Sequence, residues 1–173
     1  MSDRNSYSPG LFCWIDLATH DRQAAIAFYN ELLGWTNSGT GAAEEAPYSI
    51  WSYGDDAVGG VWQIEDEMDE PTWLSYIAVE DAAATAEQVL TLGGSLHRVV
   101  TDVGDPGIMA AFRDPEGALF AVWQAKGHIG ATRGGEPISP AWFELSCHDM
   151  TAAKAFYGAL FGWDFSTVDT PAG

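Results

Sequence analysis

Hydrophobic and polar positions follow two recurring patterns along this chain. Short apolar runs rich in β-branched and aromatic residues predict strands, and apolar residues spaced three and four apart predict helices. The run Leu11–Leu17 is the first predicted strand. Asp21 can cap a helix that follows, and Gly34 can end it. One apolar face of this helix is predicted to consist of Ala25, Phe28, Tyr29 and Leu32.

The same order of elements then appears a second time. Further strands are predicted at Trp35–Gly39, Tyr48–Tyr53, Val58–Ile64, Trp73–Val79, Ser95–Val100, Ile108–Arg113 and Ala118–Gln124, with a second helix at Ala82–Leu92. The predicted fold class is α+β. Two βαβββ units, about residues 8–65 and 72–126, are expected to form a curved mixed sheet around a cavity. Together they make one complete domain, residues 1–126.

An internal repeat extends the pattern beyond this domain. The segment 14–38 recurs without a gap as 142–166, with about half of the positions identical. Residues 127–140, rich in Gly and Pro, predict a linker. Residues 141–173 then predict the start of a second, incomplete domain, with a strand at Ala141–Ser146 and a helix at Thr151–Phe161.

Such a tail cannot be stable alone, because one strand and one helix bury too little apolar surface. We expect either that the chain is part of a longer protein or that the tail is covered. The cover is expected to be the first domain or a second copy in a homodimer.

The net charge of the chain limits the classes of partner that we expect it to bind. The 173 residues contain 7 Lys and Arg against 25 Asp and Glu, a formal net charge of −18. No basic stripe exists to hold phosphates, so we expect neither a nucleic acid nor an anionic membrane as partner. No apolar run approaches the roughly 18 residues of a membrane helix, and the polar start Met1–Gly10 lacks a signal core. We therefore expect a cytoplasmic protein whose partner is a small molecule.

Three motifs carry a family resemblance. Asp21-x-x-x-Ala25-x-x-Phe28-Tyr29-x-x-Leu32-Leu33-Gly34-Trp35 spans the first predicted helix and recurs from Asp149 to Trp163. Asp114-Pro115-Glu116-Gly117 precedes the last strand of the first domain. With the paired βαβββ units, these motifs resemble the vicinal oxygen chelate superfamily of glyoxalases, bleomycin resistance proteins and dioxygenases. Trp73-Leu74-x-Tyr76-Ile77-x-Val79 resembles the two-domain glyoxalase-like proteins of actinobacteria.

The resemblance also locates a metal site. Enzymes of this superfamily hold a divalent metal with His, Gln or Glu in the opening and closing strands of each unit. The matching positions here are Trp14, Gly60, Leu74 and Ala121, whose side chains offer no ligand atoms. A shift of one residue in register brings in Cys13, Ile15 or Trp73 and still no set of three ligands. We therefore expect no metal and no cofactor.

Strand alternation predicts what lines the cavity instead. If Trp14 faces inward, Phe12 and Asp16 are expected to do the same, whereas Trp62 is expected to face away. Further inward positions are Leu74, Tyr76, Ala78, Leu119, Ala121 and Trp123. The candidate ligand-binding residues are Trp14, Asp16, Gly60, Leu74, Tyr76, Ala121 and Trp123.

Asp16 allows two interpretations. It is either a structural acid bonded to backbone or to a Tyr or Trp donor, or a group that orients a ligand and acts as general base. Four functions follow. The first is a metal-free protein that binds a small, partly aromatic molecule. The alternatives are a metal-free lyase or isomerase with Asp16 as catalytic base, a metal-dependent lyase or dioxygenase, and an interaction module.

Overall fold

The computed structural model describes residues 4–39, 48–65 and 70–168. Within them, a single sheet of eight strands has the order β2-β3-β4-β1-β5-β8-β7-β6. The strands are β1 (Phe12–Thr19), β2 (Thr36–Gly39), β3 (Tyr48–Tyr53), β4 (Asp56–Gln63), β5 (Thr72–Ala78), β6 (Ser95–Asp102), β7 (Gly107–Arg113) and β8 (Leu119–Ala125). The helices are α1 (Arg22–Leu33), α2 (Ala82–Thr91) and α3 (Met150–Phe161).

The sheet is built from the two predicted units. In each unit the opening and closing strands pair in parallel, β1 with β4 and β5 with β8. The two opening strands, β1 and β5, then pair antiparallel at the centre and join the units into one curved mixed sheet. The α+β fold with paired βαβββ units is confirmed. Asp21, Asp81 and Asp149 cap the three helices through their carboxylates.

Each unit packs its helix on one face of the sheet. Ile26 of α1 lies in a core cluster with Trp35, Trp51 and other buried residues of the first unit. Val89 of α2 lies in a second cluster with residues of β5, β7 and β8. A third cluster covers the opposite face and contains Trp14, Tyr76, Ala121 and Trp123. That opposite face holds the candidate site.

Two of the four residues predicted for the buried apolar face of α1 are exposed. Phe28 and Leu32 are 57% and 61% exposed, whereas Ile26 is buried against the sheet. Tyr29 packs its ring on Trp35 and Trp51, so the side of α1 that carries Tyr29 is the one that faces the core. The helix is rotated so that residues 22, 26, 29 and 33 point inward, because the aromatic cluster of the first unit lies on that side.

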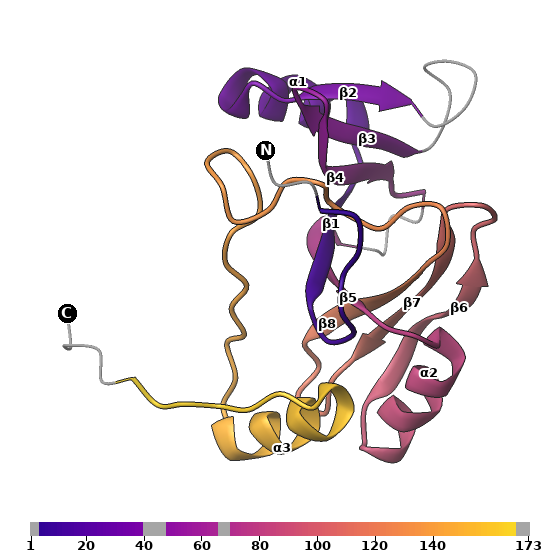
Figure 1. Cartoon of the computed structure of the whole chain (residues 1–173), viewed down its shortest axis with the longest axis vertical. Coiled ribbons are helices and arrows are strands. Elements are labelled where there is room, and N and C mark those ends of the chain that lie inside the picture. The colour runs from indigo at the N-terminus through magenta and orange to yellow at the C-terminus, as the bar shows by residue number, and fades with distance from the viewer. Residues whose placement is uncertain (1–3, 40–47, 66–69, 169–173) are drawn as a thin grey trace.

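The C-terminal tail folds back on the second unit. Helix α3 is confirmed, and it lies beside α2 at the opposite end of the molecule from α1 (Figure 1). Phe156, Tyr157 and Leu160 are buried in the same core cluster as Phe112 and Phe120. This is the intramolecular cover that was one of the two expected for the tail.

The predicted strand at Ala141–Ser146 is wrong. This segment is extended but pairs with no strand. Its Phe143 ring stacks on Phe12 of β1 at a centroid distance of 4.1 Å. Since β1 lies at the centre of the sheet and already has β4 and β5 as neighbours, no strand edge is available there.

The repeated helices α1 and α3 use different faces. Phe156 and Leu160 are the repeats of Phe28 and Leu32, yet the former pair is buried and the latter exposed. Thus α3 docks on the second unit through a face that α1 presents to solvent. The shared motif specifies a helix but leaves open which of its apolar positions become buried.

A carboxylate of the second unit holds the start of α3. The backbone N–H groups of His148 and Asp149 each donate to Glu116 at 2.7 Å. Deeper in the contact, the Tyr157 hydroxyl donates to Asp114 at 3.0 Å. The docking therefore depends on acids of the turn between β7 and β8.

This arrangement predicts a pH dependence. The two N–H donors lower the pKa of Glu116 from its ordinary value of 4.5. A lowered folded-state pKa stabilises the fold above the unfolded pKa, and that contribution is lost as pH falls through the folded value. We expect Glu116→Gln to lower the melting temperature at pH 7 and to have little effect once the pH is well below about 4.

Thermal unfolding of both proteins across this range provides the measurement. Glu87→Gln, an exposed acid on α2, is the matched control, and His148→Ala isolates the imidazole whose Nδ1 lies 3.5 Å from Glu116. An equal loss at neutral and acidic pH in Glu116→Gln is incompatible with the proposed linkage.

None of the helices in the described part of the chain is long and apolar enough to cross a membrane.

Candidate functional site

A buried carboxylate lies at the centre of the sheet. Asp16 is 5% exposed and sits on β1, opposite Gly60 of β4 and Leu74 of β5. Its Oδ1 accepts hydrogen bonds from Trp14 Nε1 at 2.7 Å and from the Tyr48 hydroxyl at 2.8 Å. A Tyr or Trp donor was expected as the partner of Asp16 if that acid is structural, and both kinds of donor are present here.

The surroundings shift the titration of all three acidic groups here. Burial raises the pKa of Asp16, and hydrogen bonds from Tyr48, Tyr76 and Trp14 oppose that rise. Burial, together with the charge of Asp16, raises the pKa of Tyr48 and Tyr76 well above the ordinary tyrosine value. Both tyrosines therefore keep their hydroxyl protons at neutral pH and remain donors.

Gly60 is required by this network. A Cβ atom at position 60 would overlap the Asp16 carboxylate and the Tyr48 hydroxyl. Glycine thus leaves space, but the space is filled by the groups around Asp16 rather than by a ligand.

The four family metal positions do not fit a divalent cation. Trp14, Gly60, Leu74 and Ala121 offer no side-chain ligand atom, and all four are buried. Within the described residues, no group of three His, Cys, Asp or Glu could hold a metal. The space beside Gly60 is occupied by the Asp16 carboxylate and the Tyr48 hydroxyl, and no step of a reaction is assigned to a metal.

The other predicted residues pack beside the Asp16 network. We call the buried group of Trp14, Asp16, Tyr48, Tyr76, Ala121 and Trp123 the plug. Tyr76, Ala121 and Trp123 are buried beside Trp14 in one cluster, and Trp123 Nε1 donates to the His128 carbonyl at 2.7 Å. The His128 ring meets Trp14 edge to face at 4.7 Å. The structure therefore brings the seven candidate residues together, mainly as buried core, and of the seven Leu74 and Trp14 reach a cavity.

An open cavity begins farther along the same face. Its volume is about 460 Å³, within the range of small-molecule sites. Ala18, two residues beyond Asp16 on β1, and Leu74 of β5 mark where plug and cavity meet. The lining consists of Ala18, Trp62, Ile64, Glu70, Pro71, Thr72, Leu74, His97, Arg98, Arg113 and Leu119. Of the seven candidate residues, only Leu74 lines it.

Trp62 is the main correction inside this cavity. It was expected to face away, yet it forms part of the wall. Because strand side chains have a period of two, Trp62 shares the face of Gly60 on β4, and that signal was present in the sequence. The Arg98 guanidinium lies over the Trp62 ring, 4.2 Å from the ring centroid.

The arginines of the cavity were harder to predict. Strand β6 pairs with β7 through two register irregularities, one between Leu96 and Arg98 and one between Arg98 and Thr101. Such bulges break the alternation on which face predictions rest. Arg113 was predictable in principle, since it pairs with Leu119, a residue correctly expected to face the cavity.

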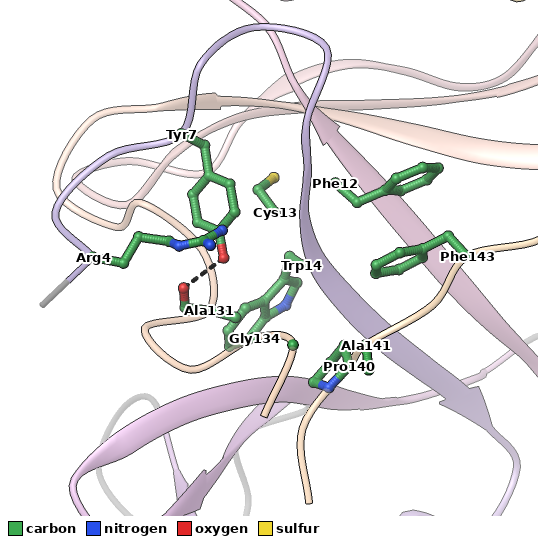
Figure 2. A pocket seen from close by; sticks show the side chains of 11 residues that line it. Arg4, Tyr7, Phe12, Cys13, Trp14, Ala131, Gly134, Pro140, Ala141 and Phe143 are labelled. Carbon is green, nitrogen blue, oxygen red and sulfur yellow. Dashed lines mark hydrogen bonds between the residues drawn. The ribbon is translucent and has the colours of Figure 1, made fainter. Parts of the chain in front are cut away.

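A second, smaller cavity lies at the other end of β1. It measures about 160 Å³ and is lined by residues that include Arg4, Tyr7, Trp14 and Phe143. Figure 2 shows Arg4 and Tyr7 on one side of it and Phe143 on the other, with the hydrogen bond from the Tyr7 hydroxyl to the Ala131 carbonyl. This volume is below that of a typical ligand site.

Phe12 corrects a further expectation at this end. It was expected to share the face of Trp14 and Asp16. Instead it packs against the helix-side core, with Phe143 stacked on it. The pairing of β1 with β5 shifts between Phe12 and Trp14, and this β-bulge at Cys13 reverses the alternation for the residue before it.

Comparisons with known proteins agree with this architecture. A family model described as the glyoxalase/bleomycin resistance protein/dioxygenase superfamily matches residues 12–122. The putative glyoxylase CFP32 of Mycobacterium tuberculosis is 36% identical over 179 residues, covering 100% of this chain and 68% of that protein. The anthracycline biosynthesis protein DauV of a Streptomyces species is 34% identical over 170 residues, covering 90% of this chain.

The chain spans only 62% of the length of the Streptomyces relative. Among solved structures, the Mn(II)-bound glyoxalase from Novosphingobium aromaticivorans superposes with a TM-score of 0.56 at 15% identity. That match covers 90% of this chain and 54% of the other, and it supports the fold alone. From the family match and the two relatives together, the chain belongs to the glyoxalase/bleomycin resistance protein/dioxygenase superfamily.

Proposed function

We propose that the chain binds a small, partly aromatic molecule in the 460 Å³ cavity and does so without a divalent metal. The observation that carries this proposal is the cavity itself. It is large enough for a small ligand, and its wall combines an indole, Trp62, with both apolar and polar side chains. Indole faces stack well on flat rings.

The closed plug around Asp16 supports the metal-free part of the proposal. The side chains at the four family metal positions offer no metal-ligand atoms, and the space beside Gly60 is occupied by Asp16 and Tyr48. Asp16 as a general base remains a prediction, and the proposal gives it no catalytic role. Its carboxylate lines neither cavity, and a base must reach the proton that it removes.

A ligand screen by thermal unfolding tests the proposal. Aromatic fragments are screened with EDTA and, separately, with added Ni²⁺, Zn²⁺, Mn²⁺ or Fe²⁺. A ligand present at 100 times its Kd stabilises the folded state by about 2.7 kcal/mol, roughly 5–10 °C for a chain of this size. We expect such shifts in EDTA, with no further gain from any metal.

Two tryptophan variants locate the site. Trp62→Ala is expected to abolish the shift, whereas Trp142→Ala, at a residue 82% exposed outside the cavity, is expected to retain it. Binding that requires a metal, or that survives Trp62→Ala unchanged, would contradict the proposal.

A further inference from the structure

The 460 Å³ cavity has an unusual charge for this protein. The whole chain carries 7 Lys and Arg against 25 Asp and Glu. Two of those cations, Arg98 and Arg113, line this one cavity, and the only acid in the described lining is Glu70. Counting the described lining residues and leaving His97 aside, two arginines and one glutamate give one net positive charge, in a protein whose net charge is −18.

Among the residues that the structure describes, neither arginine is paired with an acid. Elsewhere, Lys126 pairs with Asp102 at 2.7 Å, and Arg133 pairs with Glu136 at 3.0 Å. Among the described residues, no carboxylate lies within ion-pair distance of Arg98 or Arg113. Within the described part of the chain, two guanidinium groups without a carboxylate partner therefore face one cavity, and together they favour an anionic ligand there.

The contacts of both arginines leave donors available. Arg98 rests its flat face on the Trp62 ring, and a guanidinium stacked in this way keeps its N–H groups in its own plane. In the described structure those groups make no hydrogen bond. Arg113 uses one Nη to donate to the Gly117 carbonyl at 2.9 Å, a contact that fixes the side chain and leaves its other N–H groups available.

We propose that this cavity selects an anionic ligand, a flat aromatic molecule bearing a carboxylate, with Arg98 and Arg113 holding the charge. The inference rests on the proposed function and adds the ligand class to it. Guanidinium donors match the two oxygens of a carboxylate, and one carboxylate balances the net charge of the wall. The ring then lies among the apolar residues Ile64, Leu74 and Leu119.

Three naphthalene probes that differ in the charge of their substituent test the preference for an anion. These are 2-naphthoate, the uncharged 2-naphthamide and the cationic 2-naphthylmethylammonium, each titrated by calorimetry into the full chain. We expect naphthoate to bind about tenfold or more tightly than naphthamide and the cation to bind least. Naphthyl phosphate is a fourth probe, and we expect it to bind less tightly than naphthoate.

Substitutions assign the preference to residues. Arg98→Met and Arg113→Met are each expected to weaken naphthoate about tenfold and to leave naphthamide within about twofold. Arg133→Met, outside the cavity, is the matched control. Because Arg113 also holds a turn, Arg113→Lys is included, and thermal unfolding confirms that each variant is folded. Glu70→Gln is expected to tighten naphthoate, since it removes the one acid among the described lining residues.

The outcomes separate this inference from the proposed function. Equal affinity for naphthoate and naphthamide in this cavity overturns the anion preference and leaves the proposed function standing. Tighter binding of naphthyl phosphate than of naphthoate overturns the choice of a carboxylate. Absence of binding by all four probes overturns both proposals.

Discussion

Phe156→Ala is expected to lower the free energy of unfolding by about 3 kcal/mol or more, the usual cost of truncating a buried phenylalanine. Phe156 lies in the core cluster that α3 shares with α2 and the second unit. Removing its ring leaves a cavity at the centre of that contact. Urea unfolding measures the loss, and hydrogen exchange of the α3 amides shows whether the tail separates from the domain.

Phe28→Ala is the control that the repeat supplies. Phe28 occupies the same motif position on α1, and in both helices the ring meets the following tyrosine edge to face at 5.0 Å. Only the burial differs, so we expect a cost below about 1 kcal/mol. Similar costs for the two variants would mean that the exposed face of α1 is covered in solution, as in a dimer, or that α3 does not dock as described.

The second large effect is expected at Asp16. Asp16→Asn should destabilise the fold by roughly 2 kcal/mol or more, because Trp14 and Tyr48 both donate to one carboxylate oxygen and an amide brings its own donors among them. A buried donor left without an acceptor costs about 1–3 kcal/mol. Ligand affinity per folded molecule is expected to change little, since Asp16 does not line the 460 Å³ cavity.

Denaturant unfolding and calorimetry on the same preparations separate the two effects. Asp55→Asn, at an exposed acid in the turn between β3 and β4, controls for the loss of one charge. Tyr48→Phe combined with Asp16→Asn should cost less than the sum of the single changes, because both act on one network. If the Asp16→Asn protein is stable but binds the ligand much more weakly, then Asp16 orients the ligand and this prediction is wrong.

The fold was predictable because its signals are local and repeated. Helix caps such as Asp21 and Asp81, and the recurrence of the strand pattern, do not depend on distant contacts. The buried face of α1 was less predictable, since Ile26 and Leu32 are both apolar and only the position of Trp51 decides between them. The unpaired segment 141–147 was missed for the same reason: strand formation needs an available edge, and the position of the edges follows from the whole topology.

The candidate site shows a similar division. Strand alternation correctly placed Leu74, Tyr76, Ala121 and Trp123 on the face opposite the helices. It could not show how these side chains pack together. That packing depends on the contact of Trp14 and Asp16 on β1 with Tyr48 on β3, two strands separated by β4. The bulges near Phe12 and Arg98 broke the alternation where the rims of the two cavities lie.

The crowding at Gly60 has an evolutionary meaning. A descendant of this protein could not regain a metal ligand at position 60 by one substitution, because any side chain there meets Asp16 and Tyr48. Those two groups, on β1 and β3, would have to change first, and each such change breaks a buried hydrogen bond. A step toward a metal ligand at position 60 thus lowers stability before any ligand set exists. We expect lineages that carry this network to have diversified through the rim of the open cavity, where Arg98 and Trp62 can change without disturbing the interior.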